Sequence, residues 1–400
     1  MKPNRFMLAL AALCFAAGGA SAQQTDGKSV APKTYKAYMV SDAHLDTQWN
    51  WDVQTTIREY IPRTLFQNLY LMERFPDYRF SFEGGVVYSW MKEYYPMHYE
   101  RMKKYIASGQ WHIAGASWDA NDPNMPSAES FIRNILQGQE LYKREFYKKE
   151  FGVRSTDIFL PDCFGFGYTL PTIAAHSGLI GMSTQKLSWR NHDFYDTPYH
   201  KKNPFSWGVW YGIDGSSLIA AFDTGGYNSE LPENVQYNER LMERAAHGYD
   251  NTCFRYYAGG GEGVGDKGNS GTVTTCRRLT KAINDPNAPI EIISATSDDL
   301  FKAYLGRKAE LPSFDGELLM DVHATGCYTS QTAMKYYNRR NEELTGAAER
   351  AAVAADWLGA LAYDQRKLTE IWQRFIWHQF HDDLTGTSIP EAYTCRGTTS

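Results

Sequence analysis

The sequence predicts an α/β fold built on a parallel sheet or barrel and followed by a helical domain. Strand-like apolar segments alternate with amphipathic, helix-like segments between residues 34 and about 184. Acidic and histidine residues follow several of these strands, which is typical of parallel strands that end at a site. After about Thr332 the character of the chain changes to helix. A chain of 400 residues is long enough to bury a large core.

The first elements are a strand, a helix and two further strands. Residues 34–41 have β character and run directly into a His-x-Asp segment. A helix is expected over 57–75, because four apolar side chains share one face: Tyr60, Leu65, Leu69 and Met72. Residues 78–83 alternate like a strand, and so do residues 111–114, which lead into a loop.

The next elements bring a second acidic residue to the end of a strand. Ser127-Ala128-Glu129 opens a long helix to about residue 151. A short buried strand over 157–161 ends at Asp162, and a helix over 170–176 and a strand near 182–184 follow. Carboxyl ends of parallel strands meet at one edge of a sheet. We therefore expect Asp46, Asp162 and the loop after Ala114 to lie at that edge.

The N-terminus predicts export. Lys2 and Arg5 precede a short apolar stretch and the small residues Ala20-Ser21-Ala22, which is the pattern of a signal peptide over residues 1–22. That stretch is too short to span a membrane, and no later segment is long and apolar enough. We expect a mature protein in the periplasm or outside the cell, with a flexible lead-in over 23–33.

Composition excludes one class of partner. The net charge is -5 and no Lys/Arg run is long enough to bind nucleic acid. The 27 Tyr, 20 Phe and 11 Trp are mostly core residues, although aromatic faces also pack on sugar rings. The cysteines after residue 22 are odd in number and include no CxxC pair, which leaves open at most a bridge such as Cys253–Cys276.

Three segments carry residues that suit a divalent metal. His44 and Asp46 are two residues apart and project on the same side of an extended backbone. Asp162 precedes glycines that allow a tight turn, so its carboxylate can be aimed into a site. His381 is followed by two aspartates. Two histidines with two or three aspartates make a metal-dependent hydrolase the leading hypothesis.

Each segment also has a purely structural explanation. His44 and Asp46 fit an exposed loop and turn, and Asp162 fits a helix N-cap. His378 and His381 are near neighbours on a helix, whose C-terminus favours histidine.

Other chemistry is less well supported. The glycine-dense loop over 259–271 matches neither a phosphate loop nor a dinucleotide-binding turn, and it presents Glu262 or Asp266. The chain has no Gly-x-Ser-x-Gly, and Cys163 has no His partner apparent in the sequence. A serine or cysteine nucleophile is therefore disfavoured.

Six segments occur in an order that resembles glycoside hydrolase family 38, the α-mannosidases, in its bacterial branch. They are HLDTQWNW, GASWDANDPNMPSAES, FLPDCFGFGYTLP, TQKLSW, GCYTSQ and QFHDDLTGTSIPE. The resemblance covers residues 41–393. It implies a seven-stranded (β/α) barrel-like catalytic domain over 34–331 and the start of a three-helix bundle over 332–400. It also implies β domains beyond residue 400, so we expect part of a longer protein or a truncated product.

The resemblance implies roles for particular residues. One zinc ion per chain would be held by His44, Asp46, Asp162 and His381. Asp162 would also be the nucleophile that forms a glycosyl-enzyme. In the bacterial pattern, Gly-x-Gly-Asp carries the general acid/base, which selects Asp266, although the residues beyond it depart from the pattern.

The resemblance also implies contacts to the sugar. Trp49 would stack on the ring, Asp382 would hold a hydroxyl, and Lys186 matches a basic residue near the site. The expected substrate is a mannose-containing oligosaccharide or glycoprotein glycan, and a homo-oligomer is left open. Two alternatives to a zinc-dependent retaining α-mannosidase stay open. They are a metal-dependent polysaccharide deacetylase and a truncated, inactive mannose-binding remnant.

Overall fold

The structure is a computed structural model that describes residues 33–143, 151–187, 203–259, 266–320 and 323–394. The predicted signal peptide and almost all of the lead-in lie outside these ranges. Residues Lys33–Ser400 form one compact unit. Within the described ranges, no helix has both the length and the apolar character that crossing a membrane requires.

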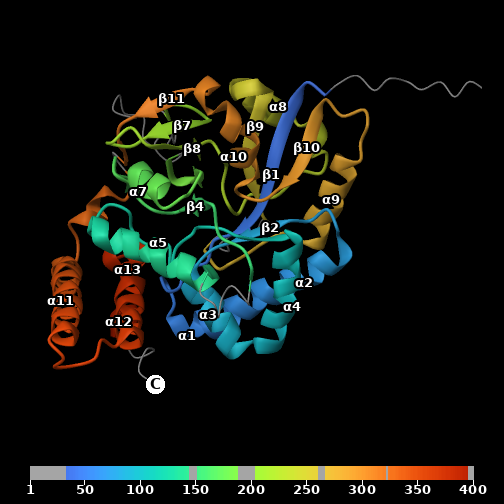
Figure 1. The fold of residues 1–400 in the computed structure, drawn as a ribbon. Helices are drawn as coiled ribbons and strands as arrows, with labels where there is room; N and C mark the ends of the chain where they lie inside the picture. The colour runs from blue at the N-terminus through green and yellow to red at the C-terminus, as the bar shows by residue number, and fades with distance from the viewer. Residues whose placement is uncertain (1–32, 144–150, 188–202, 260–265, 321–322, 395–400) are drawn as a thin grey trace, which may run out of the picture. The chain divides into compact units, whose positions relative to one another are not determined.

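Strand β1 (Tyr35–Ala43) is the centre of the first sheet (Figure 1). It runs parallel to β9 (Thr252–Tyr257), β10 (Ile290–Ala295) and β2 (Phe80–Phe82), and β2 pairs with β3 (Trp111–Ile113). The last two residues of β1 pair with β2, whereas the preceding ones pair with β9 and β10. Because these strands are parallel, the residues that follow them gather at one edge.

The second sheet has the order β11-β7-β8-β6-β4. Its strands are β11 (Ser313–Asp315), β7 (Trp207–Tyr211), β8 (Ser217–Ala221), β6 (Gly181–Ser183) and β4 (Asp157–Phe159), parallel except at β7 and β8. A ribbon joins β5 (Gly165–Phe166) to β12 (Leu318–Leu319). The described chain is therefore a mixed α/β fold with parallel sheets, as predicted. The seven-stranded barrel is not confirmed.

The two sheets share a hydrophobic core. One cluster of buried side chains draws residues from the strands of both sheets or from directly after them: Val40, Ala114, Phe159, Ile219, Ala221, Tyr256 and Ala295. The short strands β2 and β4 are buried along their whole length. Strands covered on both faces have apolar runs, and burial of this surface stabilises the fold by roughly 25 cal/mol per Å².

Helices pack around the sheets (Figure 1). Between β1 and β3 lie α1 (Val53–Thr55), the π-helical turn Thr56–Tyr60, α2 (Ile61–Arg74), α3 (Gly85–Tyr94) and α4 (Pro96–Ser108). Later come α5 (Ala128–Lys143), α7 (Leu170–His176), α8 (Glu239–His247), α9 (Val273–Ile283) and α10 (Asp299–Tyr304). Helix α2 buries Leu65, Leu69 and Met72, the apolar face that the sequence predicted.

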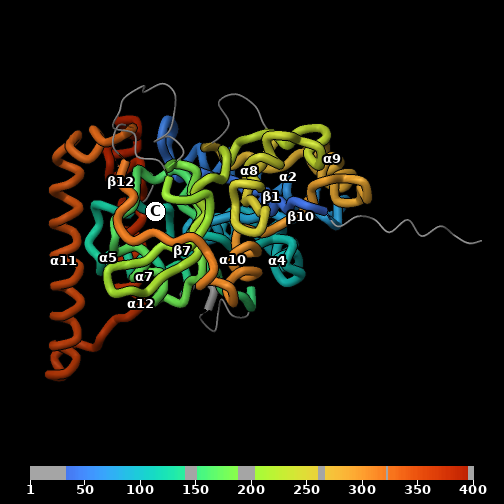
Figure 2. The backbone as a smooth tube through the Cα atoms, turned by 90° about the horizontal axis from the view of Figure 1, so that it is seen from above, coloured from blue at the N-terminus to red at the C-terminus, as the bar shows by residue number. Residues whose placement is uncertain are grey.

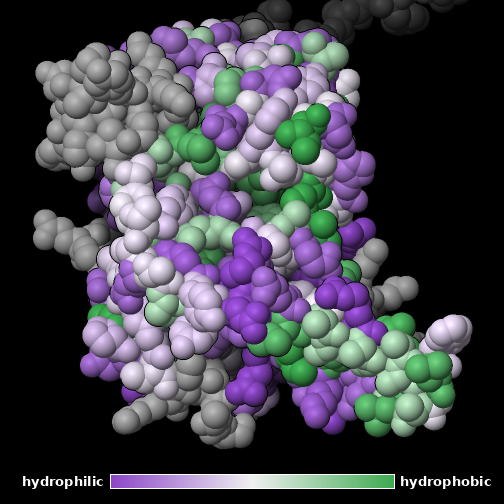
Figure 3. Space-filling view, turned by 90° about the vertical axis from the view of Figure 1, so that its left-hand side faces the viewer, coloured by the Kyte–Doolittle hydropathy of each residue, from purple (hydrophilic) through white to green (hydrophobic). Residues whose placement is uncertain are grey.

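The C-terminal region is helical. It contains α11 (Thr332–Trp357), α12 (Gln365–Trp377) and the short α13 (His381–Leu384). Figure 2 shows α11 along one side of the molecule. Apolar side chains near the end of α11 are exposed, Trp357 by 85% and Leu358 by 75%, and this end protrudes in Figure 3. A three-helix bundle is not shown by the described residues.

The strands and helices predicted from the sequence are confirmed, with small shifts of their ends. The expected strands at 34–41, 78–83, 111–114, 157–161 and 182–184 correspond to β1, β2, β3, β4 and β6, and the helix over 170–176 is α7. The helix expected from Ser127 is α5, whose described part ends at Lys143. Cys253 and Cys276 are both buried free thiols.

Candidate active site

Two neighbouring strands of the first sheet end beside each other and supply three polar side chains. His44 and Asp46 follow β1, and Glu83 follows β2. All three are buried, with exposures of 0%, 1% and 5%. His44 Nε2 lies 2.9 Å from Asp46 Oδ1, and His44 Nδ1 lies 3.0 Å from Glu83 Oε1. The two-residue spacing of His44 and Asp46 therefore does bring their side chains together, as the sequence predicted.

His381 reaches the same place from the helical region. It is the first residue of α13 and is fully buried. Its Nδ1 lies 2.7 Å from the carbonyl oxygen of Ala120, and its Nε2 lies 3.4 Å from Asp46 Oδ1. The His381 and His44 rings stack with centroids 5.4 Å apart. A carbonyl oxygen only accepts hydrogen bonds, so Nδ1 of His381 donates, and Nε2 faces Asp46.

These three residues fit a divalent metal. His44 Nε2, Asp46 Oδ1 and His381 Nε2 are buried, have no hydrogen-bond partner outside this group and lie within 4.8 Å of one another. Burial disfavours protonated His44, but Asp46 and Glu83 outweigh burial and raise its pKa well above the usual value. The site thus favours positive charge, which a metal ion supplies when it takes the place of protons. Histidine nitrogen and carboxylate oxygen are ligands that zinc takes.

Two more carboxylates border this group. Asp162 follows β4, and its Oδ1 lies 2.7 Å from the ammonium nitrogen of Lys186, which follows β6. Asp266 lies next to the segment after β1 that carries His44 and Asp46, because its carbonyl oxygen accepts the backbone N–H of Asp46 at 2.9 Å. His44, Asp162 and Asp266 each offer one atom within 4.8 Å of the others. The structure therefore brings both predicted catalytic carboxylates to the His44 group.

The segment that carries Asp266 is held alongside residues 44–46. Gly268 N donates to the carbonyl oxygen of His44 at 2.7 Å, and Leu45 and Lys267 form an antiparallel bridge. Gly268 has φ +71°, and a Cβ there would lie 2.4 Å from Thr64 Oγ1, so the close approach requires glycine. Burial, followed by the charges of Asp46 and Asp162, raises the pKa of Asp266 to about 6.

The predicted sugar contacts lie on adjoining segments. Asp382 is buried and accepts a hydrogen bond from Thr387 Oγ1. Its pKa is raised to about 7, mainly by burial and then by the charge of Asp46. Trp49 is half-buried in the loop after Asp46, and its carbonyl oxygen accepts the N–H of Ile389 at 2.8 Å. This bond ties the Trp49 loop to the segment after α13.

Some sequence candidates lie elsewhere. His378 points to Asp383, with Nδ1 and Oδ2 3.3 Å apart, and does not belong to the group around His44. Cys163 is buried, and burial raises the pKa of its thiol to about 11, although His381 lies beside it and lowers that pKa. Glu262 and the other residues of 260–265 in the glycine-dense loop lie outside the described residues.

Sequence reasoning missed Glu83 and Tyr227. Tyr227 follows β8, is 6% exposed, and its hydroxyl donates to Asp266 Oδ1. Its ring lies 5.2 Å from the ring of His44. Both residues come directly or shortly after a strand. That signal was present for Glu83, at the end of the predicted strand over 78–83, but β8 itself was not predicted.

A second group of histidine and aspartate is already satisfied by protein partners. His112 Nε2 lies 2.8 Å from Asp157 Oδ1 and 3.7 Å from Asp298 Oδ1. Asp157 also accepts from Ser297 at 2.6 Å, and Asp298 pairs with Lys302 at 2.6 Å. These atoms form an ion-pair network, so the geometry favours a structural role for this group over a metal site.

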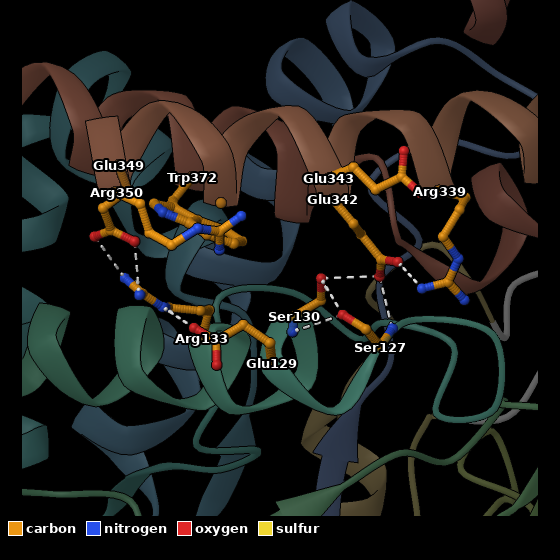
Figure 4. Close-up of a pocket in the computed structure, with 11 residues that line it drawn as sticks. Ser127, Glu129, Ser130, Arg133, Arg339, Glu342, Glu343, Glu349, Arg350 and Trp372 are labelled. Carbon is orange, nitrogen blue, oxygen red and sulfur yellow. Dashed lines mark hydrogen bonds and ion pairs between the residues drawn. The ribbon is translucent and has the colours of Figure 1, made fainter. Parts of the chain in front are cut away.

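A cavity of about 570 Å³ lies between α5, α11 and Trp372 of α12 (Figure 4). None of the residues predicted for the site lines it. Its charged side chains pair with one another: Arg133 with Glu129 and Glu349, and Arg339 with Glu342. Glu342 also accepts from the backbone N–H of Ser127 at the start of α5, at 2.6 Å. The cavity is therefore part of the junction between the helical region and α5.

Two family models match successive parts of this chain. The family model of the glycosyl hydrolases family 38 N-terminal domain matches residues 34–317, and that of the alpha mannosidase middle domain matches residues 322–398. Alpha-mannosidase G of Dictyostelium discoideum is 33% identical over 363 residues, which cover 90% of this chain and 31% of that protein. Human alpha-mannosidase 2C1 is 30% identical over 381 residues, covering 94% and 34%. The chain thus spans about a third of the length of these relatives.

A solved structure shows the same fold. An alpha-mannosidase from Enterococcus faecalis V583 superposes with a TM-score of 0.68 at 20% identity, over 90% of this chain and 40% of that one.

Proposed function

The chain belongs to glycosyl hydrolase family 38, and we propose on that premise that it is a zinc-dependent, retaining α-mannosidase acting on terminal α-mannosyl residues of glycans. The observation that carries the proposal is the convergence of His44, Asp46 and His381 with Asp162 and Asp266. The relatives that support the substrate class are named alpha-mannosidases.

The proposed metal ligands are His44, Asp46, Asp162 and His381. Three of them present buried atoms with no hydrogen-bond partner outside the group, and an atom of the fourth, Asp162, lies within 4.8 Å of His44. Glu83 and the carbonyl of Ala120 hold the Nδ1 atoms of the two histidines, which orients both rings. Zinc bound there would act as a Lewis acid toward sugar hydroxyls and favour a distorted ring.

Asp162 is the proposed nucleophile and Asp266 the proposed general acid/base. In the first step a carboxylate oxygen of Asp162 bonds to the anomeric carbon while the glycosidic bond breaks and Asp266 gives its proton to the leaving oxygen. In the second step Asp266 takes a proton from water, whose oxygen displaces Asp162. One oxygen atom of Asp162 lies within 4.8 Å of one oxygen atom of Asp266. This close approach supports retention, for which about 5–5.5 Å separates the two carboxyls.

The remaining predicted residues would bind the sugar and orient the nucleophile. Lys186 holds Asp162 Oδ1 at 2.7 Å, so its first role is to fix the direction of attack. Asp382 would accept a sugar hydroxyl, and Trp49 would stack on the apolar face of the ring. These roles stay predictions.

The test is hydrolysis of p-nitrophenyl α-mannoside by the purified chain, with chelator and with added zinc. We expect turnover that chelator abolishes and zinc restores, and that Asp162→Asn lowers by at least about a thousandfold. Asp214→Asn is the matched control. Asp214 lies in the turn between β7 and β8 and so precedes β8, whereas the site residue Tyr227 follows that strand. A folded, zinc-loaded chain without turnover would contradict the proposal for this segment. A fluorosugar label that fails to attach to Asp162 in an active chain would contradict the covalent step and favour metal-bound water, as in a deacetylase.

A further inference from the structure

Tyr227 is a buried side chain that contacts both His44, a proposed metal ligand, and Asp266, the proposed acid/base. Its hydroxyl donates to Asp266 Oδ1, and its ring lies 5.2 Å from that of His44 at an angle of 56°. Only 6% of Tyr227 is exposed. A buried tyrosine needs a hydrogen-bond partner for its hydroxyl. That need alone does not explain why the partner is the carboxyl of Asp266.

The backbone of Tyr227 is fixed by the residue next to Lys186. Gln185 Oε1 accepts the N–H of Tyr227 at 3.1 Å, while Lys186 Nζ lies 2.7 Å from Asp162 Oδ1. Two consecutive side chains after β6 thus act on the two proposed catalytic carboxyls. Lys186 contacts Asp162 directly, and Gln185 acts on Asp266 through Tyr227. A Cβ on Gly226 would lie 3.3 Å from Gln185 Oε1 and 2.9 Å from Asn228 Oδ1, so a larger residue would disturb this bond.

The direction of the Tyr227 bond has a chemical consequence. A tyrosine hydroxyl that donates to Oδ1 leaves that oxygen as an acceptor, so the proton of neutral Asp266 is on Oδ2. When Asp266 has given up its proton, the same bond becomes a hydrogen bond to a carboxylate, which is roughly twice as strong as a neutral one.

We propose that Tyr227 is a positioning residue that makes Oδ2 of Asp266 the oxygen that exchanges the proton. The inference rests on the proposed function. In the first step the Oδ2–H bond breaks, the proton goes to the leaving oxygen and the carboxylate accepts from Tyr227 Oη. In the second step Oδ2 takes the proton from the attacking water, and Tyr227 keeps its own proton throughout.

The test compares leaving groups in Tyr227→Phe. A dinitrophenolate leaves without a proton, whereas the alkoxide of methyl α-mannoside requires one. The ratio kcat/KM reports only the first step. We expect kcat/KM for the alkyl mannoside to fall on the order of ten- to a hundredfold, and that for dinitrophenyl α-mannoside to fall less than about threefold. Tyr304→Phe is the control, because Tyr304 is a buried tyrosine whose hydroxyl bonds Asp250 Oδ2 at 3.1 Å. That contact lies before β9, at the end of the strand opposite to Asp266.

The outcomes separate this inference from the proposed function. Wild-type protein that hydrolyses neither mannoside contradicts the proposed function. Active wild type with an equal loss for both substrates in Tyr227→Phe, or with no loss, overturns the role of Tyr227. If Tyr227→Phe does not fold, Gln185→Leu removes the hold on the Tyr227 backbone and should give the same selective loss at smaller size. An equal loss for both substrates in that variant overturns the inference as well.

Discussion

Substitution of Glu83 is expected to weaken metal binding in a graded way. Glu83 Oε1 lies 3.0 Å from His44 Nδ1, and the pair is buried, with exposures of 5% and 0%. Such a carboxylate holds the imidazole in the tautomer whose Nε2 binds metal and makes that nitrogen more basic. Loss of this kind of partner costs about 10- to 100-fold in metal affinity, or about 1.4–2.7 kcal/mol.

The structure predicts different losses for two replacements. Glu83→Gln keeps an oxygen acceptor for Nδ1 and loses only the charge, which is worth about 1 kcal/mol per hydrogen bond and corresponds to about a five- to tenfold weaker affinity. Glu83→Leu removes the acceptor as well and frees the ring, so we expect about a hundredfold loss. Because Glu83 Oε2 has no hydrogen-bond partner, the leucine leaves no additional partner unsatisfied there.

The assay is competition for zinc with a chromophoric chelator, together with the melting temperature of each metal-free variant. Glu349→Gln is the matched control, because it removes the charge of a carboxylate that pairs with Arg133 at 2.8 Å in the junction with α5. Its zinc affinity should equal that of the wild type. A Glu83→Leu protein that folds and binds zinc within about twofold of wild type would refute the assignment of His44 Nε2 as a ligand.

Three further predictions concern stability. Glu342→Gln removes the negative charge that accepts the N–H of Ser127 at the start of α5, and it should lower the free energy of unfolding by about 2 kcal/mol, or the melting temperature by about 3 °C. Thermal denaturation measures this, and the control Glu343→Gln, at an exposed residue, should show no resolved change. Gly138→Ala places a Cβ 2.3 Å from backbone of the loop after β3, so we expect at least about 3 kcal/mol of destabilisation in urea, and a wild-type midpoint would contradict this packing. His112 and its carboxylate partners predict pH dependence. Burial opposes the charges of His112 and Asp298, but His112 and Lys302 hold the pKa of Asp298 at about 2, and Asp157, followed by Asp298, raises the pKa of His112. The stabilisation is therefore complete between about pH 4 and 6.5 and falls on either side, and a stability gap between wild type and His112→Gln that stays constant from pH 5 to 9 would be inconsistent with it.

Local patterns predicted the elements that carry the first half of the site. The strand before His44 could be identified from its β character, and the strand before Asp162 as a short, largely apolar run. The intervening helices predict that each strand pairs in parallel with its neighbours, as β1 does with β2 and β4 with β6, although β1 and β4 lie in different sheets. The resemblance supplied the roles of His381 and Asp266, which no local pattern identifies.

The rest of the site depends on contacts between residues far apart in sequence. Tyr227 reaches Asp266 through β8, a strand that was not predicted, and Lys186 contacts Asp162 where the sequence suggested only a basic residue near the substrate. The number of strands in each sheet is also a long-range property. The sequence offered a sheet or a barrel, and the ladders of the described strands give two five-stranded sheets and a two-stranded ribbon.

The candidate metal group joins the two segments that the family models match. His44, Asp46 and Asp162 lie within residues 34–317, whereas His381 lies within residues 322–398. Helix α11 holds the His381 segment on both sides, because Gln379 Nε2 donates to Asn338 Oδ1 and Lys335 Nζ donates to the carbonyl of Thr385, each at 2.8 Å. Metal affinity therefore depends on the contacts that Asn338 and Lys335 make with the His381 segment. A substitution of either residue that leaves the sheets intact should still lower zinc affinity, and the sheets without the helical region would lack the fourth proposed ligand.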